Sequence, residues 1–254
     1  MSGRLTIVGL GPGDPRYWTR EAADALQTAD VLYGYGPYLD RVPPRDGQAR
    51  HPSGNRVEGA RAEAALSQAA DGALVAMVSG GDPGVFAMAA AVCGEIDAGP
   101  DAWRAIDMQV VPGITAMLAV AARVGAPLGH DFCVMSLSDN LKPWDLIERR
   151  LDAAASAGFV IALYNPISKA RPWQLGEAFT RLSRHLAAST PVVFGRAMGR
   201  ADEAVTITTL DKAGETEADM ATLVIVGSPE TRLISRPGRE PLVYTPRAAA
   251  EALA

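Results

Sequence analysis

Short apolar runs alternate with amphipathic segments along the first half of the chain. Apolar runs rich in β-branched residues predict buried strands, here at residues 5–10, 31–33, 73–78 and 108–111. Small apolar residues that recur at helical spacing predict helices, here at residues 20–28, 57–70, 85–96 and 116–124. Thr19 is placed to cap the first helix. Strands that alternate with helices indicate an α/β fold with largely parallel pairing.

After Gly125 the order of the predicted elements changes. Strand patterns occur at residues 132–136, 159–164, 192–195, 205–209 and 223–227, and helical patterns at residues 144–157 and 172–187. The last three strands lie close together in sequence, which favours antiparallel or mixed pairing. We therefore expect two α/β domains, residues 1–113 and 114–240, that share a cleft, followed by a tail at residues 241–254.

Two segments fit neither pattern. Residues 34–59 are rich in Pro, Gly and Arg, which predicts a long irregular segment of a kind that is often functional. Residues 248–254 are rich in alanine and predict a terminal helical tail without an obvious partner.

Composition narrows the class of protein. A net charge of -5 argues against nonspecific nucleic-acid binding, which needs a broad basic surface. Cys93 and Cys133 are expected to be small core residues, and with three histidines they form neither a metal-ligand spacing nor a disulfide framework. No apolar run reaches the ~20 residues of a membrane helix, and the strand pattern starts too early for a signal peptide. We expect a cytoplasmic protein without a metal, a membrane or a nucleic-acid partner.

Glycine-rich loops follow three of the strands in the first half. They are GLGPGD at residues 9–14, SGGDPGV at residues 79–85 and PGIT at residues 112–115, and each opens a helix. Any one of them could be no more than a turn. In a parallel sheet, however, such loops meet at one edge, which is where α/β proteins bind ligands.

The chemistry of these loops favours a ligand that is positively charged and has no phosphate. The first loop lacks the third glycine of the dinucleotide fingerprint G-x-G-x-x-G, because Asp14 stands there, and Pro12 removes a backbone donor. The chain also has no G-x-x-x-x-G-K-[ST] phosphate loop. Asp82 in the second loop suits a positive charge, and Thr115 at a helix start suits a carboxylate. S-adenosylmethionine, with its sulfonium, amino and carboxylate groups, meets these requirements.

The loops also resemble, in the same order and over nearly the whole chain, the motifs of the tetrapyrrole (corrin and porphyrin) methylases. The matching motifs are at residues 9–14, 79–84, 112–116 and 219–227. Within that family, residues 79–88, 130–139 and 164–168 are similar to the enzymes that methylate precorrin-3B at C-17. The resemblance implies a homodimeric C-methyltransferase of cobalamin biosynthesis, which binds S-adenosylmethionine between its two domains and contracts the tetrapyrrole ring to precorrin-4.

The resemblance also implies which residues contact the cofactor. They are Pro12, Gly80, Gly81, Asp82, Val85, Thr115, Ala116, Tyr164, Asn165, Ala197, Met198, Ala221 and Thr222. The motifs in the second half of the chain are looser than the glycine loops.

Ring contraction, as the resemblance implies it, calls for a base that removes a hydroxyl proton. Related uroporphyrinogen methylases have an aspartate after the second strand, whereas residues 33–38 of this chain read YGYGPY. The identity of this base is therefore not assigned, and Asp139 and His130 are the two candidates. Either residue could be structural instead, Asp139 as the cap of a turn and His130 as a hydrogen-bonded histidine of the fold.

A precorrin carries many carboxylates, so its pocket should be basic. The side chains that suit it are Tyr35, Arg41, Arg45, Arg50 and Arg56 of the irregular segment, with Lys142 and Arg171 of the second half. The alternative is a solvated loop with ordinary surface arginines.

Other functions stay open. A nicotinamide-dependent oxidoreductase would need the third glycine and an acidic residue that ends the second strand, and Asp30 precedes that strand. A noncatalytic tetrapyrrole carrier would bind no S-adenosylmethionine. Within the same fold, methylation of another precorrin carbon, of diphthine or of ribosomal RNA would keep the cofactor and change the substrate.

Overall fold

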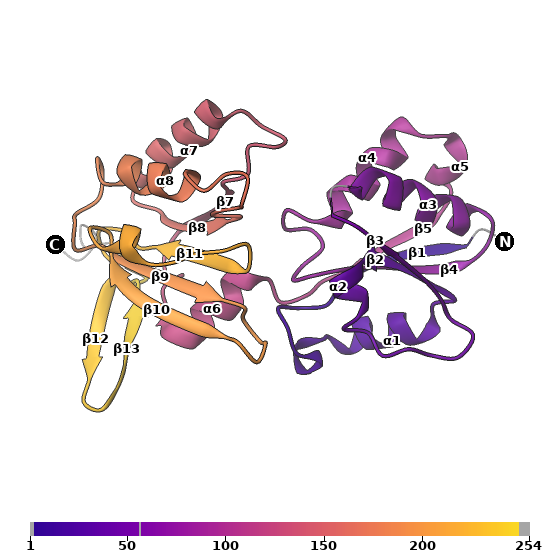
Figure 1. The fold of residues 1–254 in the computed structure, drawn as a ribbon, viewed down its shortest axis with the longest axis horizontal. Coiled ribbons are helices and arrows are strands. Elements are labelled where there is room, and N and C mark those ends of the chain that lie inside the picture. The colour runs from indigo at the N-terminus through magenta and orange to yellow at the C-terminus, as the bar shows by residue number, and fades with distance from the viewer. Residues whose placement is uncertain (1–2, 56, 249–254) are drawn as a thin grey trace. The chain divides into compact units, whose positions relative to one another are not determined.

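The computed structural model describes residues 3–55 and 57–248. They belong to two compact units, Met1–Ala116 and Met117–Ala254, and each unit is described by itself. In each unit the ribbon shows a central sheet with helices packed against it (Figure 1). Both units are therefore of the α/β type that the sequence predicted.

The first unit is built on a parallel sheet of five strands. In spatial order they are β3 (Ala49–Ser53), β2 (Val31–Tyr35), β4 (Leu74–Ser79), β1 (Arg4–Gly9) and β5 (Asp107–Val111). Val75 of β4 lies opposite both Leu5 of β1 and Val31 of β2. Because every pairing is parallel, all five strands end at the same edge of the sheet.

Helices cover both faces of this sheet (Figure 1). On one face lie α3 (Glu58–Ala70), α4 (Met88–Ala98) and α5 (Asp101–Arg104), and on the other lie α1 (Arg20–Thr28) and α2 (Gly36–Leu39). The short 3-10 helix η1 (Pro15–Tyr17) precedes α1. Along β1, Leu5 and Ile7 pack into the core under α3 and α4, and Val8 packs with α1. Strands that are covered on both faces are apolar throughout, which explains their continuous apolar runs in the sequence.

The cap predicted for the first helix is present. The side-chain oxygen of Thr19 accepts a hydrogen bond from the backbone N–H of Ala22 at 3.0 Å. This bond satisfies one of the donors that the first turn of a helix leaves open. The observed helix, Arg20–Thr28, has the bounds that the sequence predicted.

The second unit contains a mixed sheet of five strands. In spatial order they are β10 (Ala204–Thr209), β9 (Pro191–Arg196), β11 (Thr222–Val226), β8 (Val160–Tyr164) and β7 (Phe132–Ser136). The β7–β8 pair is parallel and the other neighbours are antiparallel, which confirms the predicted mixed pairing. As a result, β7, β8 and β9 end at the edge where β11 begins.

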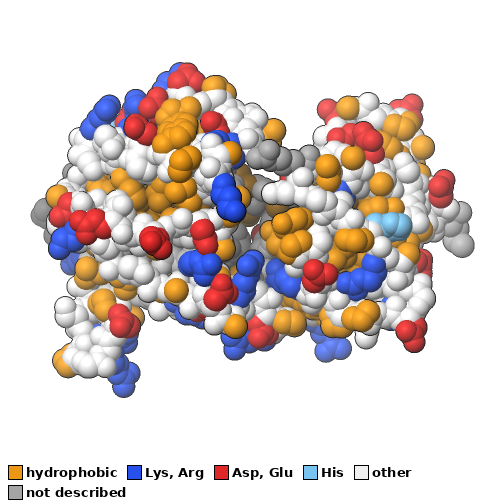
Figure 2. All heavy atoms as spheres, in the orientation of Figure 1, with side chains coloured by type: hydrophobic (Ala, Val, Ile, Leu, Met, Phe, Trp, Pro, Cys, Tyr) orange, Lys and Arg blue, Asp and Glu red, His pale blue; other side chains and the backbone are white. Residues whose placement is uncertain are grey.

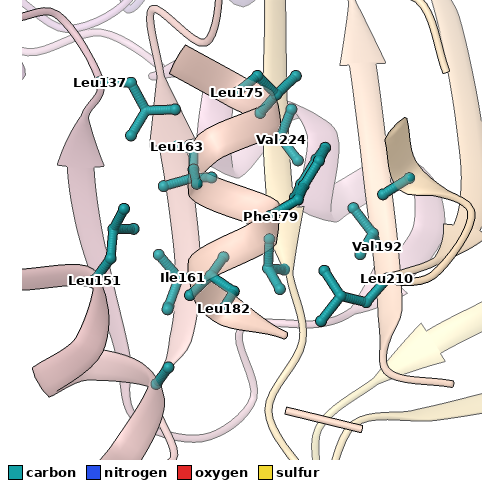
Figure 3. Close-up of a cluster of buried hydrophobic side chains, with 14 of the residues drawn as sticks. Leu137, Leu151, Ile161, Leu163, Leu175, Phe179, Leu182, Val192, Leu210 and Val224 are labelled. Carbon is teal, nitrogen blue, oxygen red and sulfur yellow. The ribbon is translucent and has the colours of Figure 1, made fainter. Parts of the chain in front are cut away.

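One face of the mixed sheet is covered by α7 (Trp144–Ser156) and α8 (Gln174–Leu182). Figure 3 shows Leu151 of α7 and Phe179 and Leu182 of α8 in one buried cluster with Ile161 and Leu163 of β8. The short 3-10 helix η2 (Ala213–Glu215) adds Ala213 to the same cluster. This core anchors the loops that leave β7 and β8.

The structure also contains elements that the sequence did not predict. In the segment expected to be irregular, β3 and α2 are regular, and α5 was missed as well. A separate small sheet consists of β12 (Arg232–Arg236), β13 (Arg239–Tyr244) and β6 (Gly125–Ala126). Because β13 crosses residue 240, the expected tail begins inside a strand. The helical tail expected at residues 248–254 lies outside the described residues, apart from residue 248.

The two cysteines differ in their surroundings. Cys133 is half-buried on β7, and burial raises the pKa of its thiol to about 11, so it stays protonated and unreactive at neutral pH. Cys93 is exposed on α4, and the prediction that it belongs to the core is wrong. Its neighbour Val92 occupies the buried face of that helix instead.

The other face of the mixed sheet packs closely on α6 (Ala116–Val124) and generates a testable prediction. A Cβ at Gly195 of β9 would lie 2.1 Å from a methyl carbon of Val120 on α6. We expect Gly195→Ala to lower the free energy of unfolding by about 1–3 kcal/mol through overpacking. As the control, Gly176→Ala on α8 adds a Cβ that meets nothing within 4 Å and should raise the same free energy by about 0.5–1 kcal/mol. Urea unfolding followed by circular dichroism measures both variants, and the same change in both would contradict the close packing.

Candidate functional site

The three glycine loops of the first unit lie side by side at the carboxyl edge of its sheet. Gly11 and Gly81 exchange two backbone hydrogen bonds of 3.1 and 2.9 Å, which join the first loop to the second. Gly113 of the third loop lies so close that a Cβ there would be 2.2 Å from the carbonyl oxygen of Gly81. The convergence predicted from the sequence is confirmed, and we call residues 9–14, 79–85 and 112–116 the loop cluster.

Asp82 holds the second and third loops together. Its Oδ1 accepts a hydrogen bond from the N–H of Gly84 at 2.8 Å, and its Oδ2 accepts one from the N–H of Gly113 at 3.0 Å. The sequence had suggested that this carboxylate faces a cationic ligand, whereas both oxygens bind the backbone. Its negative charge nevertheless remains within the loop cluster, where it favours a positively charged ligand.

Seven of the predicted cofactor residues belong to the loop cluster. They are Pro12, Gly80, Gly81, Asp82, Val85, Thr115 and Ala116, the last of which begins α6. Thr115 is buried. The ring of Tyr38 lies against Gly80, where a Cβ would be 2.6 Å from a ring carbon. A neighbouring side chain therefore already explains why position 80 is a glycine.

The other predicted cofactor residues gather at one edge of the mixed sheet of the second unit. They lie at the ends of β8 and β9 or at the start of β11, and are Tyr164, Asn165, Ala197, Met198, Ala221 and Thr222. The N–H of Ala197 donates to the carbonyl of Ala221 at 3.0 Å. Nδ2 of Asn165 donates to Oγ of Ser136 at 2.9 Å, and the hydroxyl oxygen of Tyr164 accepts from the N–H of Met117 at 3.0 Å. Hydrogen bonds thus join the strand ends to one another.

Asp219 shapes this second edge, and sequence analysis did not single it out. Its Oδ1 accepts hydrogen bonds of 2.9 Å from both the N–H of Ala221 and the hydroxyl of Thr222, and its Oδ2 accepts one of 2.8 Å from Arg196. Burial acts to raise the pKa of Asp219, but these hydrogen bonds outweigh it and hold the pKa below its usual value. One sequence signal could have identified Asp219: an aspartate before a strand often accepts a hydrogen bond from the N–H two residues further on, as in an Asx-turn.

Backbone strain marks the same loops. Among the described residues, the non-glycine residues with positive φ are Phe86 at 51°, Asn165 at 50° and Ala197 at 50°. Phe86 directly follows the second loop of the first unit, and the other two lie at the edge of the second unit. Such conformations cost energy and are concentrated at functional sites, so the strain and the motifs point to the same places.

The two candidate bases lie at opposite ends of β7. Asp139 follows its carboxyl end, and Oδ1 of Asp139 accepts hydrogen bonds from Arg171 at 2.6 Å and Gln174 at 2.9 Å. His130 precedes the strand, and its Nδ1 accepts a hydrogen bond from the N–H of Asp131 at 2.7 Å. The five residues of β7 span roughly 16 Å. The two side chains therefore cannot act on the same proton.

Three arginines that were predicted to bind the substrate donate hydrogen bonds to backbone carbonyls of the first unit. Arg41 donates to the carbonyls of Leu10 and Gly11 in the first loop, at 2.6 and 3.0 Å. Arg45 and Arg50 likewise donate to backbone carbonyls. These bonds satisfy buried carbonyl groups, so the fold alone accounts for the three side chains.

The remaining predicted substrate residues are divided between the units. Tyr35 ends β2, and its ring packs edge-on against Tyr38 with 5.4 Å between ring centroids. Lys142 and Arg171 belong to the loops that follow β7 and β8 in the second unit. Arg56 lies outside the described residues.

Within residues 3–55 and 57–248, no group of three or more His, Cys, Asp or Glu side chains is arranged to hold a metal ion. None of the helices in this part of the chain is both long enough and apolar enough to cross a membrane. Figure 2 shows acidic and basic side chains interspersed over the face in view.

The chain is similar to known proteins over nearly all of its length. Residues 4–214 match the model of the family described as Tetrapyrrole (Corrin/Porphyrin) Methylases. A precorrin-3B C(17)-methyltransferase of Sinorhizobium sp. is 62% identical over 247 residues, which are 97% of each chain. The crystal structure of the methyltransferase CobJ has a TM-score of 0.91 and 45% sequence identity, and the match covers 96% of this chain and 100% of that chain.

A more distant solved structure shares the fold. The uroporphyrin-III C-methyltransferase of Thermus thermophilus, solved as a complex with S-adenyl homocysteine, has a TM-score of 0.68 at 23% identity over 89% of this chain and 97% of that chain. The family match, the shared fold and the motif-bearing loops at the two strand edges all indicate the same family. The chain belongs to the tetrapyrrole (corrin/porphyrin) methylase family.

Proposed function

We propose that this protein is an S-adenosylmethionine-dependent C-methyltransferase of corrin-ring biosynthesis, which methylates precorrin-3B at C-17 and contracts the ring to precorrin-4. The observation that carries the proposal is the 62% identity to a precorrin-3B C(17)-methyltransferase over 97% of both chains. A match of that extent includes both strand edges at which the predicted cofactor residues gather.

The loop cluster suits S-adenosylmethionine better than a dinucleotide. Its glycines let a ligand approach the backbone, and the carboxylate of Asp82 places a negative charge between the second and third loops. A pyrophosphate would be repelled by that charge and by Asp14, whose carboxylate already caps the N–H of Arg16. The Thermus thermophilus methyltransferase of the same fold was solved with S-adenyl homocysteine.

The bound cofactor would supply an electrophilic methyl group whose leaving group needs no acid. The task of the protein is then to bind both ligands and to hold the accepting carbon in line with that methyl group. Orientation of this kind can account for about 7–11 kcal/mol of a reaction barrier. In this chain the task falls to strand-end loops fixed by the hydrogen bonds of Asp82, Asp219 and Arg41.

The proposal extends to the partners and the location of the protein. The tetrapyrrole is its small-molecule partner, the enzyme is a cytoplasmic homodimer, and it binds neither nucleic acid nor membrane. The family resemblance supports the dimer, and the net charge of -5 supports the lack of nucleic-acid binding. Light scattering would then give a mass of twice the 26.6 kDa of one chain.

Incubation with precorrin-3B tests the reaction directly. With S-adenosylmethionine that carries a labelled methyl group, we expect a labelled, ring-contracted precorrin-4, with the label placed at C-17 by NMR. A reaction without the cofactor is the control. A label at a different carbon would replace the C-17 assignment by another position. A protein that binds the tetrapyrrole but not S-adenosylhomocysteine would instead be a carrier.

The loop cluster predicts a specific effect of Asp82→Asn. The amide can accept only through its one oxygen, so the tie to Gly84 or to Gly113 is lost. We expect the affinity for S-adenosylhomocysteine, measured by isothermal titration calorimetry, to fall about tenfold to a hundredfold. The matched control is Asp30→Asn, because Asp30 also accepts from a backbone N–H, that of Leu74, but precedes β2 at the other end of the sheet. Equal affinities of the two variants would argue against the role given to Asp82.

A further inference from the structure

The loops that follow β7 and β8 are fastened together at the strand edge of the second unit. Nη1 of Arg171 donates to Oδ1 of Asp139 at 2.6 Å and to Oδ1 of Asn140 at 2.5 Å. Gln174 donates to the same oxygen of Asp139 at 2.9 Å. Two backbone hydrogen bonds between Ser168 and Arg171, of 3.2 and 2.9 Å, close the turn that carries the arginine. We call these five residues the clasp.

Neighbouring contacts support the clasp. The side chain of Gln174 is almost fully buried, at 1% exposure, so it holds Asp139 from the core side. The rings of Trp144 at the start of α7 and Trp173 just before α8 meet edge to face, with 4.8 Å between centroids. The two loops are therefore joined by an ion pair and by an aromatic contact, and both restrict the orientation of the guanidinium of Arg171.

The clasp leaves part of this guanidinium open. Within the described residues, Nη2 of Arg171 makes no hydrogen bond, and Nε makes only a long one of 3.5 Å to Oγ of Ser168. The side chain is 19% exposed, so a ligand can reach it from solvent. A fixed guanidinium with open N–H groups is well suited to bind a carboxylate.

Its position distinguishes Arg171 from another arginine with similar bonds. Arg181 donates to carboxylates of Glu148 and Asp152 on α7, but it lies near the end of α8, away from the strand edge. Arg171 lies in the loop that leaves β8 directly after Tyr164 and Asn165, two of the proposed cofactor residues. An anion bound by Arg171 would therefore lie at the same edge of this sheet as those residues.

We propose that Arg171 binds a carboxylate side chain of the tetrapyrrole substrate through Nη2, and that Asp139 positions this guanidinium instead of serving as the base of ring contraction. The inference rests on the proposed function, which supplies a polycarboxylate substrate. Oδ1 of Asp139 accepts hydrogen bonds from both Arg171 and Gln174. This positioning role explains why an aspartate stands here, and it requires no proton transfer by Asp139.

Steady-state kinetics of the full-length protein with precorrin-3B and S-adenosylmethionine test both roles. Arg171→Lys keeps the charge but loses the planar second nitrogen, so the KM for precorrin-3B should rise about tenfold to a hundredfold while kcat and the KM for the cofactor change little. Asp139→Asn should raise the same KM by less and leave the pH profile of kcat unchanged. Because the two residues act as a unit, the double variant should be no worse than Arg171→Lys alone.

The matched control is Arg181→Lys, which changes a similarly bonded guanidinium away from the edge and should leave the KM for precorrin-3B unchanged. An unchanged KM in a folded Arg171→Lys protein would overturn the proposal. So would an Asp139→Asn protein whose kcat collapses at constant KM with loss of the acidic limb of its pH profile, since Asp139 would then be the base. If Arg171→Lys does not fold, the split between KM and kcat in Asp139→Asn decides alone. A wild-type protein that converts no precorrin-3B would overturn the proposed function itself.

Discussion

The hydrogen bond from Gly113 to the carboxylate of Asp82 is the contact on which the loop cluster depends. Parallel strands bring three loops to one edge, but the third loop follows β5, which is an edge strand with a neighbour on one side only. Asp82 fastens this loop to the second, and the backbone pair between Gly11 and Gly81 fastens the second to the first. One carboxylate and the lack of a Cβ at Gly113 therefore set the shape of the proposed cofactor site.

In the second unit a different aspartate serves a similar purpose. Its sheet is mixed, so the edge combines the ends of β8 and β9 with the start of β11. Asp219 fixes the turn before β11 through Ala221 and Thr222, and the N–H of Ala197 joins that turn to the end of β9. Asn165 and Ala197 have positive φ at this edge. Backbone strain of this kind persists only where the surrounding contacts enforce it, and these hydrogen bonds are such contacts.

Sequence patterns located most strands and helices, and the elements that they missed are short or exposed. The apolar run of β4 and the helical spacing of α6 located both elements to within a residue or two. The strands β3 and β12 are largely exposed and carry arginine or proline, so no hydrophobic alternation marked them. Motifs located both strand edges, but they could not show that Arg41 and Arg50 bind backbone carbonyls. Every residue carries such an acceptor, and it leaves no signal in the sequence.

The charged side chains of both edges mainly hold the backbone in place. Asp82 and Asp219 accept from N–H groups, and Arg41 donates to carbonyls of the first loop. A methyl group on a sulfonium can be transferred without a proton, so orientation is the main requirement, and rigid loops supply it. Ion pairs and hydrogen bonds that fix those loops use the groups that would otherwise be taken for acids and bases. The proposed methyl transfer therefore needs no nucleophile from the protein, and of the two proposed steps only ring contraction requires a base.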